Sequence, residues 1–326
     1  MDNLCHTLAG LALGEAGLKR RTALATATLV IGANLPDVDA LSYFWGKLPA
    51  LGFRRGWTHG ILADLVWPFA LTGAMLAWDR WVRRRRNPVA EPARARGLLL
   101  LAYAAVLSHP LLDLCNTYGV RLLMPFSGRW FYGDALFIVD PWVWLALLAG
   151  ILLARRAARQ RASDPARPAR TALGLVGLYV SLMFVSGAGL RYAIGRVAAR
   201  HGFMDARIMV GPVEANPFRR DVVIELPGAY TKGTVSLLSG RLFASDWESI
   251  PRHADLPRAR AASVTHEGLT YLSWARFPYY TVGKGCPARH VCLHDARYYP
   301  RDWSEVAVPL LGPLSLAPPL SAPEQP

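Results

Sequence analysis

Four long apolar stretches constrain the fold of this chain more than any other feature. They cover residues 60–81, 97–115, 135–154 and 171–190 of a 326-residue sequence in which 52% of the residues are hydrophobic. Each stretch, folded as an α-helix, is long enough to cross a hydrocarbon core of ~30 Å. The sequence therefore predicts a mainly helical, polytopic transmembrane bundle with four long spans and not an ordinary soluble domain.

Two shorter apolar runs precede these spans. They cover residues 4–18 and 22–35, and Lys19-Arg20-Arg21 separates them. Both are near the lower length limit for a span, and both are rich in glycine and alanine, which allow helices to pack closely. We therefore expect a short N-terminal helical hairpin that packs into the bundle.

Basic residues gather at one end of the predicted helices. The formal charge is +14, and residues 80–96 hold seven arginines while residues 155–170 hold six. Both groups adjoin apolar spans, so anchoring at the cytoplasmic face explains the charge better than nucleic-acid binding, which we do not expect. The basic loops are then cytoplasmic, and the chain beyond residue 190 emerges on the extracytoplasmic side.

The character of the chain changes after about residue 195. Short β-prone segments bounded by Gly or Pro, at residues 221–226, 230–243 and 269–282, predict a small β-rich extracytoplasmic domain. We expect three parts: a transmembrane domain at 1–195, the β-rich domain at 196–311 and a disordered proline-rich tail at 312–326. The closeness of Cys286 and Cys292 leaves a disulfide and two free thiols equally open.

Histidine and aspartate residues gather at the other end of the helices. His109 and Asp113 are four positions apart, so on a helix their side chains share a face. Asp2 and His6 repeat this spacing near the start of the chain. Imidazole and carboxylate together suit zinc or another divalent ion.

Further acidic groups and a third histidine fall at the same end. Pro36 is expected to end the preceding helix and to leave Asp37 and Asp39 in an extended or turn geometry. His59 lies at the entry of the first long span, and Asp140 lies near the outer end of the third. Alone, each could be a hydrogen-bonded interface histidine or a helix cap. Together they predict one metal site that faces outward.

Energetics favour a shared site. One charged aspartate at the centre of a membrane helix costs ~2.5–3.5 kcal/mol on insertion scales, so several require compensation. Carboxylates that converge on divalent cations are compensated, and three imidazoles with up to five carboxylates exceed the needs of one four-coordinate ion. The sequence therefore allows one to three ions.

The chain resembles a known family at these motifs. Asp2-Asn-Leu-Cys-His6, Leu35-Pro-Asp-Val-Asp39, Arg55-Gly-Trp-Thr-His59 and His109-Pro-Leu-Leu-Asp113, together with residues 116–126 and 138–141, are similar to motifs of the YdjM-type inner-membrane metal-dependent hydrolases. The resemblance covers about residues 1–195. That family is in turn distantly similar to zinc-dependent phospholipase C and the P1-type nucleases.

The resemblance implies a bacterial inner-membrane hydrolase whose cofactor is a divalent metal ion, with zinc as the first candidate. The ligands that it implies are His6, Asp37, His59, His109 and Asp113, and Asp2 and Asp140 are further candidates. The chain departs from the family pattern at Arg54, where the family often has a histidine. It also offers only Asp140 as a downstream ligand, which argues against a full three-zinc cluster.

The expected reaction is hydrolysis of a phosphoester in a lipid or membrane-proximal substrate by metal-activated water. Asp37 or Asp39 would act as general base or bridging ligand. Arg55 is the first candidate for binding the substrate phosphate, and Arg121 and Arg129 are the alternatives.

Two other function classes are compatible with ligands in a membrane. A metal-ion transporter should place them near mid-bilayer, and here they cluster at one end, which disfavours transport. A non-catalytic scaffold or regulator with a structural metal site stays open, because metal-binding residues do not prove turnover.

Overall fold

The computed structural model describes residues 1–239, 247–283, 285–300 and 303–310. The chain divides into two compact units, Met1–Ile250 and Pro251–Pro326, and each is described by itself. The predicted division at residue 195 stays a prediction, and the predicted disordered tail, 312–326, lies outside the described residues.

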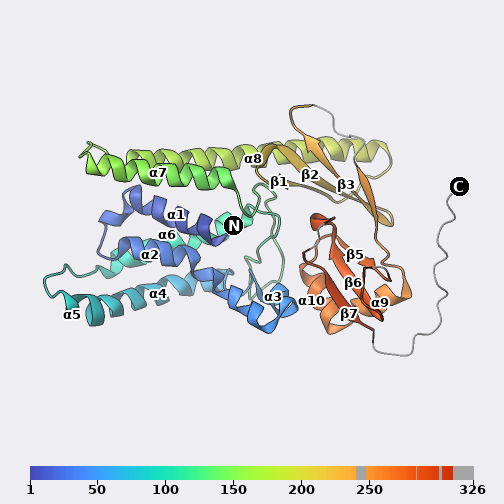
Figure 1. Cartoon of the computed structure of the whole chain (residues 1–326), viewed down its shortest axis with the longest axis horizontal. Coiled ribbons are helices and arrows are strands. Elements are labelled where there is room, and N and C mark those ends of the chain that lie inside the picture. The colour runs from blue at the N-terminus through green and yellow to red at the C-terminus, as the bar shows by residue number, and fades with distance from the viewer. Residues whose placement is uncertain (240–246, 284, 301–302, 311–326) are drawn as a thin grey trace. The chain divides into compact units, whose positions relative to one another are not determined.

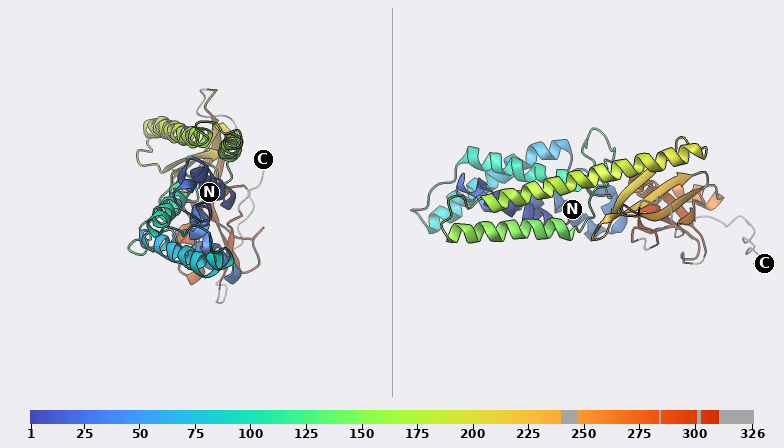
Figure 2. Two further views of the ribbon diagram at one scale, coloured as in Figure 1. Left: turned by 90° about the vertical axis from the view of Figure 1, so that its left-hand side faces the viewer. Right: turned by 90° about the horizontal axis from the view of Figure 1, so that it is seen from above.

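Four helices are long and apolar enough to cross a membrane, as predicted. They are α4 (Ile61–Trp78, continued by the π-helical η3, Asp79–Arg83, and by α5, Arg84–Arg86), α6 (Ala95–Leu114), α7 (Pro141–Arg159) and α8 (Arg167–Arg200). In the first unit α4 packs against α6 and α7 packs against α8, and α1 (Asn3–Glu15) and α2 (Ala25–Asn34) lie between these two pairs (Figures 1 and 2).

Two of these helices differ from the predicted ranges. Helix α7 begins at Pro141 and not at residue 135, because Asp140 caps it by accepting hydrogen bonds from the N–H groups of Trp142 and Val143. Helix α8 has 34 residues and is ~51 Å long, which exceeds the hydrocarbon thickness. Its far end packs Leu190 and Ile194 against Val210 and Val222 of the first sheet.

The predicted N-terminal hairpin is formed by α1 (Asn3–Glu15) and α2 (Ala25–Asn34), joined through the short 3-10 helix η1 (Leu18–Arg20). Small residues bring these helices close to their neighbours. A Cβ on Gly10 would lie 2.7 Å from the Leu29 carbonyl oxygen, and one on Gly32 would lie 2.8 Å from the Cβ of Ala105 in α6. The hairpin is therefore an integral part of the bundle.

The segment after Pro36 corrects the prediction of an extended or turn geometry. Residues Leu35–Trp45 form a 3-10 helix, η2, and α3 (Lys47–Phe53) follows it. Pro36 occupies the first turn of η2, where its missing N–H costs nothing and its fixed φ suits a helix. The proline therefore starts a helix at this point.

The remaining elements of the first unit form most of an antiparallel sheet. Its order is β1-β2-β3-β4, with β1 (Ile208–Val213), β2 (Asn216–Leu226), β3 (Ala229–Ser236) and β4 (Glu248–Pro251). The predicted strands at 221–226 and 230–243 correspond to β2 and β3, although residues 240–243 lie outside the described residues.

The second unit combines a three-stranded antiparallel sheet with helices. Its elements are α9 (Pro257–Ser263), α10 (His266–Trp274), β5 (Pro278–Thr281), β6 (His290–Asp295), η4 (Ala296–Tyr298) and β7 (Val306–Pro309). Cys286 and Cys292 form a disulfide, which resolves the alternative left open by the sequence.

The predicted strand at 269–282 is wrong over its first half, where the chain forms α10. Thr265 caps this helix by accepting a hydrogen bond from the N–H of Gly268, and the residues that it buries, Gly268, Tyr271 and Trp274, recur every three positions. Only Pro278–Thr281 is a strand. The fold class itself, a helical membrane bundle followed by a small β-rich region, is confirmed.

Candidate metal centre

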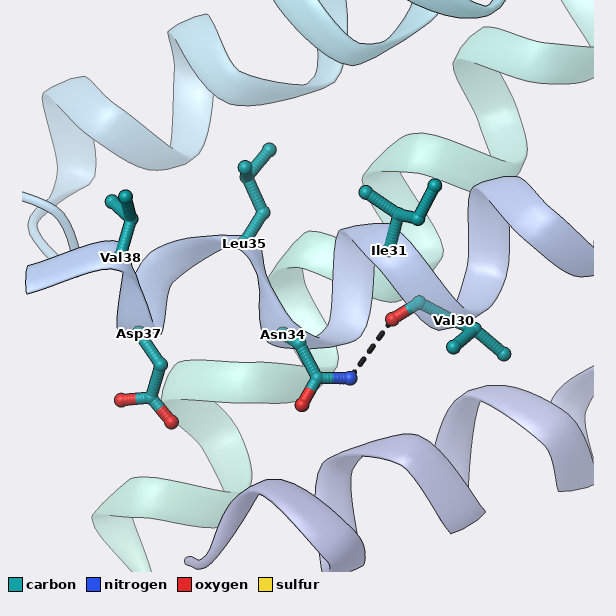
Figure 3. A pocket seen from close by; sticks show the side chains of 6 residues that line it. All are labelled: Val30, Ile31, Asn34, Leu35, Asp37 and Val38. Carbon is teal, nitrogen blue, oxygen red and sulfur yellow. Dashed lines mark hydrogen bonds between the residues drawn. The ribbon is translucent and has the colours of Figure 1, made fainter. Parts of the chain in front are cut away.

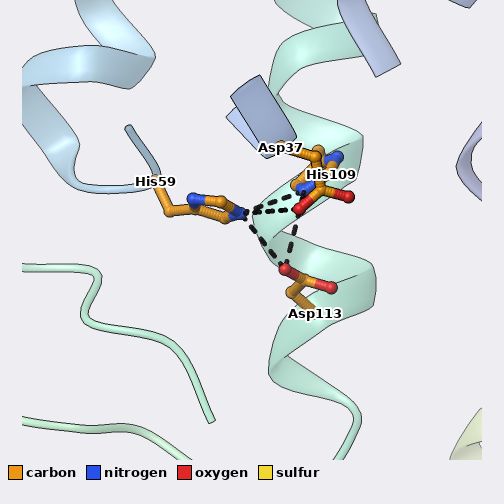
Figure 4. A group of neighbouring side chains, drawn as sticks. All are labelled: Asp37, His59, His109 and Asp113. Atoms are coloured by element: carbon orange, nitrogen blue, oxygen red, sulfur yellow. Dashed lines mark hydrogen bonds and ion pairs between the residues drawn. The ribbon is translucent and has the colours of Figure 1, made fainter. Parts of the chain in front are cut away.

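Four side chains from three parts of the chain converge at one point of the bundle (Figure 4). Asp37 comes from η2, His59 from the turn before α4, and His109 and Asp113 from successive turns of α6. One ligand atom from each lies within 4.8 Å of the others, and all four residues are buried. The helical spacing of His109 and Asp113 places both on the face that meets η2 and the His59 turn.

Both histidines are oriented by a partner on the far side of the ring. The Nδ1 of His109 lies 2.6 Å from the carbonyl oxygen of Ala33, so Nδ1–H donates there. The Nδ1 of His59 lies 3.2 Å from Asp39 Oδ2 and 2.9 Å from Thr58 Oγ1. Such outer hydrogen bonds fix the tautomer that leaves Nε2 available to a metal.

The two Nε2 atoms consequently face each other at 3.1 Å. If both Nδ1 atoms carry the proton of a neutral ring, this pair of lone pairs needs a proton or a cation between them. Asp113 Oδ2 lies 3.3 Å from His59 Nε2 and has no hydrogen-bond partner. The residues thus fit a divalent ion: two imidazole nitrogens and two carboxylates, with buried atoms unsatisfied.

In the metal-free protein a proton can fill the same gap. Burial alone would lower the pKa of His59, but its close contacts with the carboxylates of Asp113 and Asp39 outweigh burial and raise it to about 8. A metal ion that bound here would have to displace this proton from His59.

His6 lies beside the group of four. Its ring stacks on that of His109 with centroids 3.7 Å apart, and its Nε2 lies 3.4 Å from Asp113 Oδ1. Neither ring nitrogen of His6 has a hydrogen-bond partner. The amino group of Met1 also forms an ion pair with Asp113. His6 therefore borders the centre, one shell away from the four convergent ligand atoms.

Asp39 supports the centre from outside the group of four. Its Oδ2 accepts hydrogen bonds from the backbone N–H of Arg55 at 2.7 Å and from Thr58 Oγ1 at 2.9 Å. Burial alone would raise its pKa, but the contacts with His59, Arg54 and the Arg55 N–H lower it. Asp39 is thus an ionised carboxylate that positions His59.

The predicted phosphate-binding arginines lie in three different environments. Arg55 is buried; its guanidinium contacts Asp113 Oδ1 at 3.1 Å and donates to Asn116 Oδ1 at 2.9 Å. Arg121 is also buried and donates to the carbonyl of Gly52 at 2.6 Å, which ties the loop after α6 to α3. Arg129 is exposed and lies over the ring of Phe131.

Arg54 is more exposed than Arg55 and Arg121 and contacts two of the acidic side chains. Its Nη2 is 3.2 Å from Asp37 Oδ1 and its Nε is 3.4 Å from Asp39 Oδ1, while 19% of its side chain stays exposed. The sequence analysis singled out Arg54 only as a departure from the family pattern. It bridges both η2 carboxylates.

Asp2 and Asp140, the further ligand candidates, cap helices. Asp2 accepts hydrogen bonds from the N–H groups at the start of α1 and from Trp144 Nε1 at 3.1 Å. Asp140 caps α7 and accepts from the hydroxyl of Tyr179 at 3.2 Å. The structure brings neither into the group of four.

Sequence reasoning missed several residues that support the centre. Thr58 and the Ala33 carbonyl orient the two histidines, Asn3 donates to Asp37 Oδ2 at 3.1 Å, and Asn116 holds Arg55. Thr58 and Asn116 flank predicted ligands in the sequence, which is a usable signal. The Ala33 carbonyl carries none, because its role depends on how α2 packs against α6.

An apolar hollow of about 440 Å³ adjoins the centre on the side of Asp37 (Figure 3). Its lining is Val30, Ile31, Asn34, Leu35, Asp37 and Val38, all from α2 and η2. Among these residues only Asp37 belongs to the group of four. Asp37 is therefore the member of the group of four that borders this hollow.

Comparison with known proteins agrees with this architecture. The chain is 26% identical over 161 residues to the uncharacterized protein YfhP of Bacillus subtilis (strain 168), an alignment that covers 47% of this chain and 46% of that relative. The match thus spans about half the length of the curated relative. No solved structure matches the chain, and the distant similarity to phospholipase C and P1-type nucleases finds no support.

The family model of the YdjM inner membrane protein matches residues 1–190. These residues include α1 to α7, most of α8 and every member of the group of four. The match spans more than half of the chain. The chain therefore belongs to the YdjM inner membrane protein family.

Proposed function

We propose that this protein is a membrane-bound, metal-dependent hydrolase that acts on a phosphoester of a lipid or membrane-proximal substrate. One observation carries the proposal: the Nε2 atoms of His59 and His109 face each other at 3.1 Å, and the buried Oδ2 of Asp113 lies within 3.5 Å of both. A buried arrangement of this kind is costly unless a cation completes it. We propose one ion in the group of four, with zinc as the first candidate.

A divalent ion held by these residues would act as a Lewis acid and would lower the pKa of a water molecule bound to it. The protein's own groups divide the remaining work. Asp37 borders the hollow and is placed to accept a proton from an incoming nucleophile. Arg54, partly exposed beside Asp37, is better placed than the buried Arg55 to hold a phosphate oxygen.

We also propose that the centre lies on the extracytoplasmic side. One end of the bundle holds the turn of the hairpin, the start of α6 and the end of α7, each with its basic residues. There Arg155 Nε donates to Glu15 Oε1 at 3.0 Å, and the backbone N–H of Arg94 donates to Thr22 Oγ1 at 2.7 Å. Because clustered arginines favour the cytoplasm, the opposite end with His109 and Asp113 faces outward.

A second function, a non-catalytic scaffold or regulator with a structural metal, is favoured by a different observation. His59, His109 and Asp113 are all 0% exposed, and closed sites of this kind are typical of structural ions. In that case the ion would lock η2 to α6.

The first measurement, on detergent-purified protein, tests the metal centre that both functions require. Elemental analysis should find about one equivalent of a divalent metal in the wild type and its loss in His109→Ala. His201→Ala, at an exposed histidine outside the group, should keep the metal. Equal metal content in His109→Ala and wild type, or none in either, would contradict the metal centre.

Turnover decides between enzyme and scaffold. We expect the wild type to hydrolyse a phospholipid or a chromogenic phosphodiester, and Asp37→Asn to lose this activity while its thermal unfolding stays cooperative. Full metal content with no turnover across phosphomonoesters, phosphodiesters and lipids would leave the scaffold as the function.

A further inference from the structure

In the 3-10 helix η2 the polar side chains are buried and the large apolar side chains are exposed, the reverse of the pattern in a helix that faces water. Between residues 37 and 45 the polar side chains, Asp37, Asp39 and Ser42, are buried. The exposed residues of the same stretch are Val38, Ala40, Leu41, Tyr43, Phe44 and Trp45. Phe44 is 84% exposed and Trp45 is 74% exposed. Large apolar side chains at this exposure indicate a surface that meets something other than water.

Neighbouring segments extend this surface. Phe53 at the end of α3, Trp57 in the turn before α4 and Phe126 in the loop between α6 and α7 are 41%, 54% and 81% exposed. These segments are tied together, because Arg121 donates to the Gly52 carbonyl and Arg54 lies over the ring of Tyr43. We call Tyr43, Phe44, Trp45, Phe53, Trp57 and Phe126 the aromatic surface.

The aromatic surface is continuous with a face of a transmembrane helix. Trp57 and Pro125 line a hollow of about 240 Å³ together with Leu62, Val66 and Trp67 of α4. Leu62 and Val66 are 47% and 54% exposed on a helix apolar enough to span the membrane. The residues that line this hollow include no charged side chain. We therefore infer that the medium that covers Leu62 and Val66 on α4 also covers Trp57 of the aromatic surface.

Distances along α6 place this region at membrane depth. His109 lies 13 residues beyond Arg96, or ~20 Å along the helix axis, and Asp113 lies ~26 Å along it. If Arg96 lies at one edge of a ~30 Å hydrocarbon core, His109 and Asp113 lie within that core, near its opposite edge. Asp37 and Asp39 contact this level of α6 directly or through His59.

From these observations we propose that η2 and α3, residues 35–53, form a membrane-inserted segment that does not span. Its aromatic surface sits in the outer interfacial zone of the bilayer, the zone that tryptophan and tyrosine prefer. Its backbone is helical over 35–45 and 47–53, so much of it is hydrogen-bonded within the segment, as lipid exposure favours. The inverted pattern then follows, because the carboxylates turn inward, away from lipid. This inference does not depend on metal binding or catalysis.

The proposal has a consequence for the hollow beside Asp37. Val38 and Leu35 belong both to η2 and to the hollow, so lipid that covers η2 also reaches the hollow. Molecules then approach Asp37 sideways from the bilayer, and an amphiphile with an aliphatic chain fits the apolar lining better than a water-soluble solute.

Fluorescent labels on matched phenylalanines test the insertion. Phe44→Cys and Phe218→Cys, the latter 54% exposed on β2, are labelled with an environment-sensitive dye and placed in nanodiscs of bacterial phospholipid. Cys5 and Cys115 are buried, and the wild type corrects for any label that they accept. We expect blue-shifted emission and loss of fluorescence with brominated lipids for the Phe44 label only, and quenching by aqueous iodide for the Phe218 label.

Two outcomes would overturn the proposal. Quenching of the Phe44 label by iodide to the same extent as the Phe218 label would place η2 in water. Protection of the Phe44 label from both brominated lipid and iodide would instead indicate a protein partner on the aromatic surface. Leu41→Cys, on the same face of η2, repeats the measurement if Phe44→Cys does not fold. Metal analysis of the same samples keeps the result separate from the fate of the metal centre.

Discussion

At the scale of single residues, the centre depends on hydrogen bonds that lie behind the histidines. Asp39 Oδ2 lies 3.2 Å from His59 Nδ1, and the Ala33 carbonyl lies 2.6 Å from His109 Nδ1. Each partner holds its ring in the plane and tautomer that present Nε2 to the centre. The protein's own hydrogen bonds thus hold the candidate ligand atoms in place.

Replacing Asp39 tests this arrangement. Asp39→Asn keeps the shape but removes the charge that accepts the His59 Nδ1–H, so we expect metal affinity to fall by ~10–100-fold. A competitive chelator titration measures it. Ser42→Ala is the control, because Ser42 Oγ donates only to the Asp39 backbone carbonyl. Unchanged affinity in Asp39→Asn, with a native unfolding profile, would mean that Asp39 does not position the ligand.

The raised pKa of His59 predicts a proton exchange. At about pH 7 the metal-free His59 is protonated, so binding of one divalent ion should release about one proton, and close to none at about pH 9. Because this pKa is raised, the metal-free protein gains stability from it at acidic pH and loses that stability as pH rises through about 8. Calorimetric titrations in two buffers of different ionisation enthalpy count the protons. Binding without proton release near neutral pH would contradict a charged His59.

At the scale of elements, the sequence predicted what depends on helix period and missed what depends on packing. The pair His109 and Asp113 follows from spacing alone, and so do the four spans. The interpretation of Pro36 was wrong because proline suits the first turn of a helix as well as a break. The Ala33 carbonyl was invisible, because only the approach of α2 to α6 brings it to His109.

Close approach at Gly60 holds the His59 turn against the loop 116–126. A Cβ on Gly60 would lie 2.4 Å from the Met124 carbonyl oxygen, a backbone atom that cannot move freely. We expect Gly60→Ala to lower the free energy of unfolding by ~1–3 kcal/mol, as overpacking does. Thermal unfolding in detergent measures the loss.

A second glycine provides the control. Gly73 in the middle of α4 has nothing within 4 Å of an added Cβ, so Gly73→Ala should be neutral or stabilise by up to ~1 kcal/mol. Equal effects of the two substitutions would show that the contact between Gly60 and Met124 does not hold the turn.

At the scale of the whole molecule, a polar centre and a basic end divide the bundle. The centre gathers buried carboxylates and imidazoles at one end of α6, while arginines crowd the ends of α4, α6 and α7 at the other. Such an asymmetric charge distribution sets how a bundle inserts, because short arginine-rich loops stay in the cytoplasm. Orientation then decides which leaflet supplies molecules to the hollow beside Asp37.

Labelling of engineered thiols in intact bacterial cells tests this orientation. Val89, 91% exposed in the arginine-rich loop after α5, and Leu238, 76% exposed after β3, lie on opposite sides of the membrane if the arginines are cytoplasmic. We expect a membrane-impermeant maleimide to label Leu238→Cys in spheroplasts, and Val89→Cys only after the membrane is opened. The wild type controls for its own cysteines. The reverse pattern would put the group of four at the cytoplasmic face, where cytoplasmic and not extracytoplasmic phosphoesters would be its substrates.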